Sequence, residues 1–382
     1  MEKKILIIAG ESSGDIHGAA LSRSLIELKP GIKIFGIGGD EMRKSGVHIL
    51  QDNKDMAVVG ILEVFGKIGL LYNVFKKIKN EIFSGQYSAL ILIDYPTFNM
   101  ILACLASKQR IPVFYFIAPQ IWVWGKSRIK LLARTVNRMF VILPFEEKIY
   151  KHEGMDVEFV GHPFLDRIKT TMDKEEASKK FCLNKNQKII GLLPGSRSQE
   201  IKTLFPVMLD SARKIKMEIP SVQFVLPLAK TVKKDEISGQ ISESGLDIKV
   251  IEDFTYDAIS IADLLIVASG SVTLEAAVLK KPMVIIYKLN YITYLLARLI
   301  CHIHIIGLVN IIAGKEVVPE LHQDNVTSDN ITAWVLKAVK DRKYYEEVKQ
   351  ELAKIELLLG KKGASQTTAK GIINYLYEEK SL

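Results

Sequence analysis

The stretch Leu264–Tyr287, LLIVASGSVTLEAAVLKKPMVIIY, decides how this chain folds. The apolar run Leu264–Ala268 has the length of a strand, and the small residues 269–271 end it. Helical spacing follows over Thr273–Lys280, and Pro282–Tyr287 begins a second apolar strand. The pattern predicts a β–α–β unit. The unpaired N–H groups at the start of its helix point into the preceding loop, where they attract an anion.

Glu275 lies about one turn inside the expected helix. A carboxylate at that position can accept hydrogen bonds from the hydroxyls of a sugar. The stretch therefore favours a phosphorylated ligand such as a nucleotide sugar. An ordinary structural β–α–β unit with an empty loop explains the same residues, and this stretch alone leaves both interpretations open.

The alternation of apolar strands and amphipathic helices extends over most of the chain, which is typical of two doubly wound α/β domains. The expected strands are Lys4–Ala9, Ile32–Ile37, Ala89–Ile93, Val113–Ile117, Met139–Leu143 and Glu158–Val160 in the first half, and Lys188–Leu193, Gln223–Leu226, Lys249–Ile251, Leu264–Ala268 and Pro282–Tyr287 in the second. A polar stretch beginning at His162 predicts the hinge. We expect a first domain over residues 1–165, a second over 166–344, and helices from about 345 to 382 that pack back onto the first.

The balance of charged residues indicates which kind of partner the chain binds. Lys and Arg outnumber Asp and Glu by 52 to 43, a net charge of +9, which favours acidic partners such as nucleotides or an anionic membrane surface. Nucleic acid is not favoured, because the basic residues are dispersed and do not interleave with aromatic ones. The 3 cysteines are widely spaced, so we expect a reducing cytoplasm rather than a disulfide framework. No segment reads as a targeting signal or a membrane span.

Polar loops follow several of the expected strands, and in open α/β sheets ligands bind at the carboxyl ends of the strands. The first loop and the helix after it offer Glu11, Ser12, Ser13, Asp15 and His17. The loop lacks the G-x-G-x-x-G spacing of dinucleotide binders, so a nicotinamide cofactor is not expected. Asp15 is equally well explained as a helix cap.

Asp94 ends the strand Ala89–Ile93 and is followed shortly by Pro96. A carboxylate at the end of a buried strand can act as a general base toward a hydroxyl nucleophile. An Asx turn or a helix cap explains the same residue. Asn99, five residues on, belongs to the same polar loop and helix start.

The loop Pro194–Arg197 ends a strand of the second domain. Gly195 would allow the backbone to approach a phosphate, Ser196 adds a donor, and Arg197 supplies the permanent charge that suits a diphosphate. No Asp-x-Asp occurs in the sequence, so we expect neither a metal ion nor another cofactor at the diphosphate.

The stretch Val58–Phe75 carries an apolar stripe interrupted by Glu63 and Lys67. Such a stripe is usually part of a core, but it also suits a surface that accepts acyl chains or lies on a membrane. The residues we assign to this possible surface are Val58, Val59, Ile61, Leu62, Phe65, Ile68, Leu70 and Leu71.

Ten short motifs, taken in order, resemble one family. They are AGESSGD (9–15), GIGGDEM (37–42), IDYPTFN (93–99), APQIWVWG (118–125), LPFE (143–146), VGHPFLD (160–166), LLPGSRSQEI (192–201), ASGSVTLEAA (268–277), KPMVIIYK (281–288) and VPELHQ (318–323). Each is weak alone, but their order and spacing over nearly the whole chain are similar to those of the lipid-A-disaccharide synthases.

The resemblance implies a GT-B glycosyltransferase fold, with two Rossmann-like domains facing a central cleft, and an inverting sugar transfer without a metal. It implies UDP-2,3-diacylglucosamine as donor and 2,3-diacylglucosamine 1-phosphate (lipid X) as acceptor, giving UDP and the disaccharide 1-phosphate of lipid A. The first domain would bind the acceptor and the second the donor. The enzyme would lie on the cytoplasmic face of the inner membrane as a peripheral protein. Monomer and homodimer both remain open.

The resemblance also assigns residues. Asp94 matches the base for the acceptor 6-hydroxyl, and Arg197 the arginine near the donor diphosphate. The UDP-binding positions matched are Gly195, Ser196, Ser269, Gly270, Ser271, Glu275, Asn310 and Gln323. The chain departs from the family at Thr97, where many members carry a second aspartate, and this leaves open whether Asp94 alone moves the proton.

Two rival functions remain at this point. A UDP-sugar epimerase on the same fold would need several acid–base groups around the hexose, whereas the sequence offers chiefly Asp94 and, with less support, His17. A non-catalytic nucleotide-sugar or lipid-binding protein would keep Arg197 and Glu275 and would have no use for Asp94.

Overall fold

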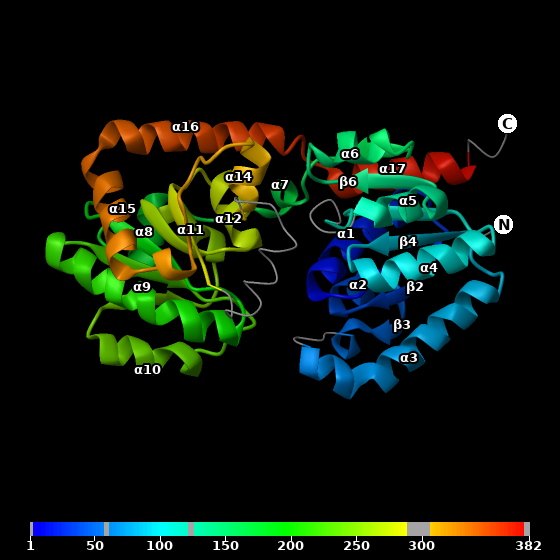
Figure 1. Ribbon diagram of the computed structural model, residues 1–382, viewed down its shortest axis with the longest axis horizontal. Coiled ribbons are helices and arrows are strands. Elements are labelled where there is room, and N and C mark those ends of the chain that lie inside the picture. Colours follow the sequence, from blue (N-terminus) through cyan, green and yellow to red (C-terminus); the bar gives the residue numbers. More distant parts are fainter. Residues whose placement is uncertain (1–2, 57–60, 121–125, 289–305, 378–382) are drawn as a thin grey trace. The chain divides into compact units, whose positions relative to one another are not determined.

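The computed structural model describes residues 3–56, 61–120, 126–288 and 306–377. The chain forms two compact units, Met1–Pro163 together with Leu359–Leu382, and Phe164–Leu358. Each unit has one parallel sheet with helices around it (Figure 1). The two α/β units, each with a single parallel sheet, agree with the architecture that the sequence predicted.

Unit 1 contains a seven-stranded sheet in the order β3-β2-β1-β4-β5-β6-β7. Every neighbouring pair of strands is parallel. The strands are β1 (Lys4–Ala9), β2 (Lys33–Gly38), β3 (His48–Asp52), β4 (Ala89–Ile93), β5 (Val113–Phe116), β6 (Arg138–Val141) and β7 (Val157–Phe159). The order reverses between β1 and β4, and this switch point is where such sheets bind ligands.

Helices cover both faces of the unit 1 sheet. One face packs on α3 (Ile61–Phe83), α4 (Pro96–Lys108) and α5 (Lys126–Thr135), and the other on α1 (Ser12–Leu28), α2 (Asp40–Lys44) and α17 (Ala364–Tyr377). A 3-10 turn (Asn53–Asp55) and α6 (Glu146–His152) complete the unit. The strands are buried on both sides, so they read as continuous apolar runs such as ALILI in β4.

Unit 2 contains a six-stranded parallel sheet in the order β10-β9-β8-β11-β12-β13. The strands are β8 (Ile189–Leu193), β9 (Gln223–Pro227), β10 (Ile248–Ile251), β11 (Leu264–Ala268), β12 (Met283–Tyr287) and β13 (Glu320–His322). The opening stretch of sequence thus forms β11, the helix α12 (Ser271–Val278) and β12. The switch point lies between β8 and β11.

One core of unit 2 lies between its sheet and the helices α9 (Ser198–Glu218), α10 (Asp235–Ser244) and α15 (Ser328–Lys340). Helix α12 packs on α14 (Leu308–Ala313) and α16 (Arg342–Leu358), and α8 (Lys174–Lys180) on α11 (Thr255–Ile261) (Figure 1). The unit begins with α7 (Phe164–Arg167), and a second 3-10 turn spans Gln323–Asn325.

Three features differ from the sequence-based expectations. Strands β3 and β13 were not predicted, because β3 is a partly exposed edge strand and β13 has only 3 residues. The C-terminal helices do not all return to unit 1: α16 packs on α12, α14 and α15, and only α17 packs on α1. The turn at Gly360, which lies against Phe159 and Gly161 of unit 1, separates these two helices.

Candidate functional site

In unit 1, the switch point brings the loop after β1 beside the loop after β4. Ala9 and Ile93 are partners in the register of the two strands, so Glu11 and Asp94 follow at the same edge of the sheet. A side chain on Gly10 would meet the ring of Tyr95 at 2.6 Å. Glycine is therefore required at position 10 for the two loops to pack this closely.

The backbone of Asp94 is held in an unusual conformation. Asp94 and Tyr95 have φ angles of 46° and 49°, the left-handed region that residues other than glycine rarely adopt. The side-chain amide of Asn99 donates to the carbonyl oxygens of Ile93 and Asp94 at 3.1 and 2.7 Å. The hydroxyl of Tyr115 donates to the same Asp94 oxygen at 2.6 Å. Strained turns held this firmly are characteristic of functional sites.

The carboxyl group of Asp94 is partly buried. Burial, followed by the negative charge of Glu11, raises its pKa to about 6. A carboxylate with a raised pKa is a better proton acceptor than an ordinary aspartate and is still ionised at pH 7. The geometry and electrostatics of Asp94 therefore fit a general base.

The other residues that we expected around the acceptor divide into two groups. Glu11, Ser12 and Ser13 are exposed at the start of α1, beside Asp94. Asn99 is completely buried, and its side-chain amide donates to the backbone carbonyl of Asp94 and so holds the turn in place. Asn99 therefore positions the candidate base and is not itself a ligand contact.

Asp15 also has a structural task. Its carboxylate accepts hydrogen bonds from the backbone N–H groups of Gly39, Glu41 and Met42 at 2.7, 3.0 and 3.0 Å. These groups begin α2, so Asp15 caps the neighbouring helix rather than its own. The side chain ties α1 to the loop after β2 and thereby fixes the Glu11–Ser13 loop.

His17 lies edge-on to Phe116, with ring centroids 6.5 Å apart. Its neighbour is His162, a buried residue of the VGHPFLD motif that we did not assign to the site. Burial and then the proximity of His17 lower the pKa of His162 to about 3, so His162 is neutral at physiological pH. A neutral buried imidazole can donate and accept hydrogen bonds, but it cannot serve as a charged group.

In unit 2, the loops 194–197 and 269–271 meet at the switch point. Leu193 and Val267 are register partners in β8 and β11, and both loops follow directly. Gly270 and Ser271 are exposed, whereas Ser269 is half-buried and its N–H donates to the Ile286 carbonyl at 2.9 Å. The two loops predicted from sequence to bind a diphosphate are therefore adjacent at one edge of the sheet.

Gly195 has a different role from the one we expected. The carboxylate of Glu200 accepts the backbone N–H groups of Ser196 and Arg197 at 2.9 and 3.3 Å. Gly195 has φ 116°, and a side chain there would lie 2.3 Å from that carboxylate. Glycine thus makes room for Glu200 rather than for a phosphate. Because Glu200 occupies the loop N–H groups, the anion-binding capacity of this loop rests on the side chains of Ser196 and Arg197.

The Arg197 side chain is 72% exposed and forms one ion pair, with Glu200, at 3.6 Å. An exposed pair at this distance holds an arginine only weakly. Tyr287, at the end of β12, lies close enough to Arg197 and Glu200 for both charges to act on its hydroxyl. Arg197 is therefore free to bind an anion at the carboxyl end of β8, and Tyr287 is a neighbour that the sequence analysis did not identify.

Glu275 is buried, with 9% of its side chain exposed, and pairs with Arg167 of α7. The Arg167 Nη2 lies 3.4 Å from Glu275 Oε1, and Arg167 Nε donates to the Tyr256 hydroxyl at 3.0 Å. Burial raises the pKa of Glu275, while Arg167 and a hydrogen bond from Tyr256 oppose the rise. Neither partner was foreseen, because both lie on other helices, Tyr256 on α11 and Arg167 on α7, 108 residues away from Glu275.

Both the nitrogen and the oxygen of the Asn310 side-chain amide form hydrogen bonds within the protein. Its Nδ2 donates to the Val318 carbonyl and to Glu320, both at 2.7 Å, and its Oδ1 accepts from the N–H groups of Val317 and Val318. The side chain is completely buried. Asn310 therefore shapes the segment that leads into β13 and is not a direct ligand contact.

Gln323 follows this segment, at the end of β13, with φ 50°. Glu320 accepts from the N–H groups of Ile306 and Gly307 at 2.8 and 3.0 Å, and its Oε2 lies 3.1 Å from His322 Nε2. Burial alone would raise the pKa of Glu320, but these hydrogen bonds outweigh it and lower the pKa. An ionised Glu320 thus ties the backbone just before α14 to β13, the strand that leads to Gln323.

Replacing Asn310 by alanine should destabilise unit 2 by about 2–3 kcal/mol, because it leaves several buried polar groups without partners. The melting temperature should fall by roughly 5–10 °C. Asn325→Ala, an exposed residue in the neighbouring 3-10 turn, is the matched control and should melt like the wild type. A normal melting temperature together with lost ligand affinity would instead make Asn310 a ligand contact.

The apolar stripe near residue 60 is described in part. Val58 and Val59 lie outside the described residues, and for Ile61, Leu62, Phe65 and Ile68 only their place in α3 is described. Further along α3, Val74, Ile78 and Ile82 are buried in the core of unit 1. Leu70 and Tyr72 are 39% and 63% exposed, and Leu71 is half-buried. The second half of α3 therefore belongs to the core on one face and presents apolar side chains on another.

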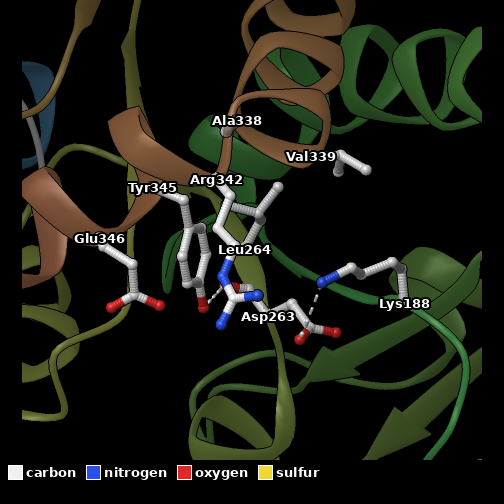
Figure 2. Close-up of a pocket in the computed structure, with 8 residues that line it drawn as sticks. All are labelled: Lys188, Asp263, Leu264, Ala338, Val339, Arg342, Tyr345 and Glu346. Atoms are coloured by element: carbon white, nitrogen blue, oxygen red, sulfur yellow. Dashed lines mark hydrogen bonds and ion pairs between the residues drawn. The ribbon is translucent and has the colours of Figure 1, made fainter.

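A pocket of about 350 Å³ lies at the opposite edge of the unit 2 sheet (Figure 2). Its lining includes Lys188 and Asp263, which precede β8 and β11 and form an ion pair at 3.7 Å. The Tyr345 hydroxyl donates to the Asp263 carbonyl at 3.3 Å. Because the candidate loops follow the carboxyl ends of the strands, this pocket is not part of their site.

In the part of the chain that the structure describes, no three His, Cys, Asp or Glu side chains lie close enough together to hold a metal ion. None of the helices described is both long and apolar enough to span a bilayer.

Comparison with known proteins identifies the family. The family model described as lipid-A-disaccharide synthetase matches residues 5–372. The lipid-A-disaccharide synthase of Geobacter sulfurreducens is 43% identical over 98% of this chain and 97% of its own length. That of Syntrophus aciditrophicus is 42% identical over 96% of each chain.

Among solved structures, the UDP-GlcNAc 2-epimerase of Neisseria meningitidis bound to UDP-GlcNAc has a TM-score of 0.63 at 16% identity, over 98% of this chain and 99% of its own. This likeness shows the fold. The sequence relatives and the family model show more: the chain belongs to the lipid-A-disaccharide synthase family, the hexosyltransferases of lipid A biosynthesis.

Proposed function

We propose that this protein transfers the diacylglucosamine group of UDP-2,3-diacylglucosamine to the 6-hydroxyl of 2,3-diacylglucosamine 1-phosphate, with inversion and without a metal ion. The observation that carries this proposal is the Asp94 turn. It presents a partly buried carboxylate with a raised pKa at the switch point of unit 1, where a hydroxyl nucleophile would bind. A protein that only bound nucleotide sugars would have no use for such a group.

In the proposed reaction, Asp94 accepts the proton of the acceptor 6-hydroxyl as that oxygen attacks the anomeric carbon of the donor. The bond from this carbon to the diphosphate oxygen breaks, and UDP leaves with the bonding electrons. Arg197 and the N-terminus of α12 meet the charge that develops on the diphosphate. Unit 1 binds the acceptor and unit 2 the donor.

UDP as the leaving group has two supports. The epimerase of similar fold was solved with UDP-GlcNAc bound. In unit 2 the loops at the switch point offer Ser196, Arg197, Gly270 and Ser271, all exposed, with Glu275 one turn further along α12. This set suits a nucleoside diphosphate, with Glu275 on the ribose hydroxyls.

We also propose a peripheral position on the cytoplasmic face of the inner membrane. Both substrates carry acyl chains, the chain has a net charge of +9, and α3 exposes Leu70 and Tyr72. Vesicles containing anionic lipid should sediment with the protein at low salt and release part of it at high salt. Full activity on dispersed lipid without vesicle binding would argue against this position.

The proposed reaction is tested by measuring UDP release from the purified protein with both lipids, and then with each one omitted. UDP should appear only when both are present, in equal amount to the disaccharide. UDP release that does not need the acceptor, or formation of an epimerised UDP-sugar, would contradict the transfer.

The rate should also depend on pH through Asp94. Because the base must be ionised, kcat/KM should rise through an apparent pKa near 6 and level off above it. Glu11→Gln removes a negative charge beside Asp94, lowers its pKa, and should move this midpoint to lower pH. A profile that Glu11→Gln leaves unmoved would assign the titration to another group.

A further inference from the structure

Arg167 lies outside the candidate donor loops and forms an ion pair with Glu275. It ends α7, the short helix with which unit 2 begins, and its guanidinium contacts two residues at once. Nη2 lies 3.4 Å from Glu275 Oε1 of α12, and Nε donates to the Tyr256 hydroxyl of α11 at 3.0 Å. Three separate helices thus meet at one carboxylate.

The contacts with Arg167 and Tyr256 offset the cost of burying the Glu275 carboxylate. A carboxylate that is 9% exposed loses most of its hydration, which favours the neutral form. The Arg167 charge and the Tyr256 hydrogen bond favour the ionised form and limit the carboxylate to one orientation. A carboxylate has about four acceptor positions, so two partners leave room for the two hydroxyls of a ribose.

We propose that Arg167 is a positioning residue of the donor site: directly and through Tyr256, it orients the Glu275 carboxylate to accept hydrogen bonds from the ribose. The inference rests on the proposed function, because it takes UDP as the ligand of α12. Arg167 itself does not touch the ligand. Its effect on binding should therefore depend on both the Glu275 carboxylate and the ribose hydroxyls.

The alternative is that the Arg167–Glu275 pair only joins α7 to α12. In that case, removing the arginine would lower stability and weaken every ligand of the site to the same extent. The two explanations differ in how the loss is distributed between ligands, so the test compares UDP with 2′,3′-dideoxy-UDP, which lacks both ribose hydroxyls.

Isothermal titration should measure both ligands with the full-length wild type, Arg167→Met, Glu275→Gln and the double variant. Wild type should bind UDP more tightly than the dideoxy compound. Arg167→Met should weaken UDP by about 10-fold, the value of one hydrogen bond to a charged group, and the dideoxy compound by less than about 2-fold. In the Glu275→Gln background, Arg167→Met should change neither affinity further.

Two more variants keep the result interpretable. Arg213→Met is the matched control, since Arg213 is also 40% exposed and ion-paired but lies near the far end of α9. It should bind both ligands like the wild type. Arg167→Lys keeps the charge without the planar fork, and should recover part of the UDP affinity.

Equal losses for UDP and the dideoxy compound in Arg167→Met, or no loss for either, would overturn the role of Arg167 while leaving the proposed function intact. A wild type that binds no UDP at all would instead overturn the proposed function, and the inference with it. Melting curves of all variants show whether a loss reflects unfolding.

Discussion

Replacing Asp94 by asparagine is expected to slow disaccharide formation by about 10²–10⁴-fold, the usual contribution of a general base. Asparagine has the shape of aspartate but does not take up a proton at neutral pH. The left-handed turn should survive, because Asn99 and Tyr115 hold the backbone carbonyl of residue 94 and not its side chain. The measurement is kcat for the variant with both lipid substrates at saturating concentration.

The same variant should bind UDP with unchanged affinity, since the proposed donor site lies in unit 2. Thr97→Ala is the control: Thr97 is exposed in the first turn of α4, at the position where the family resemblance would have led us to expect a second aspartate. Its kcat should stay within about 3-fold of the wild type, the scatter expected of a surface change. Full activity in Asp94→Asn, or a large loss in Thr97→Ala, would move the proton transfer away from Asp94.

Replacing Arg197 by methionine is expected to lower kcat by about 10²–10³-fold, comparable to removing one donor from an oxyanion site. The expected loss follows from the negative charge that develops on the diphosphate leaving group. Without a metal, the charge that develops on the diphosphate must be met by protein groups, and Glu200 already occupies the neighbouring backbone N–H groups. Arg197, 72% exposed and weakly paired, is the remaining side-chain cation of this loop.

The affinity for UDP should also fall in Arg197→Met, and guanidinium ion in the assay should restore part of the rate. Arg213→Met again serves as the control, with unchanged kinetics expected. A normal kcat in Arg197→Met, with Mg²⁺ absent, would remove Arg197 from the diphosphate and would require another group to stabilise it.

The fold could be predicted from sequence wherever strands are buried on both faces. Runs such as ALILI in β4 and LLIVA in β11 carry no polar side chains, so their length and their flanking loops define them. Strand β3 (HILQD) is partly exposed throughout, and β13 is a three-residue strand beside β12 alone. Neither segment has the continuous apolar run of a strand buried on both faces, and each becomes a strand by pairing with its neighbour, β3 with β2 and β13 with β12.

That the candidate loops of each unit lie side by side could also be predicted, because loops at the carboxyl ends of neighbouring parallel strands meet at one edge of the sheet. The roles of individual polar residues could not be predicted from the sequence. Asp15 caps a helix that begins 25 residues later. The side-chain amide of Asn310 forms hydrogen bonds with the backbone of Val317 and Val318. Glycine at 195 predicted a close approach correctly, but the group that approaches is Glu200. Partners of this kind are set by tertiary packing.

Inverting transfer without a metal is tested most directly by ¹H NMR of the product that the purified protein forms from UDP-2,3-diacylglucosamine and 2,3-diacylglucosamine 1-phosphate in the presence of EDTA. We predict a disaccharide whose new glycosidic bond has the configuration opposite to that of the donor, formed at the same rate with and without EDTA. A product with retained configuration, a rate abolished by EDTA, or no disaccharide at all would contradict the mechanism.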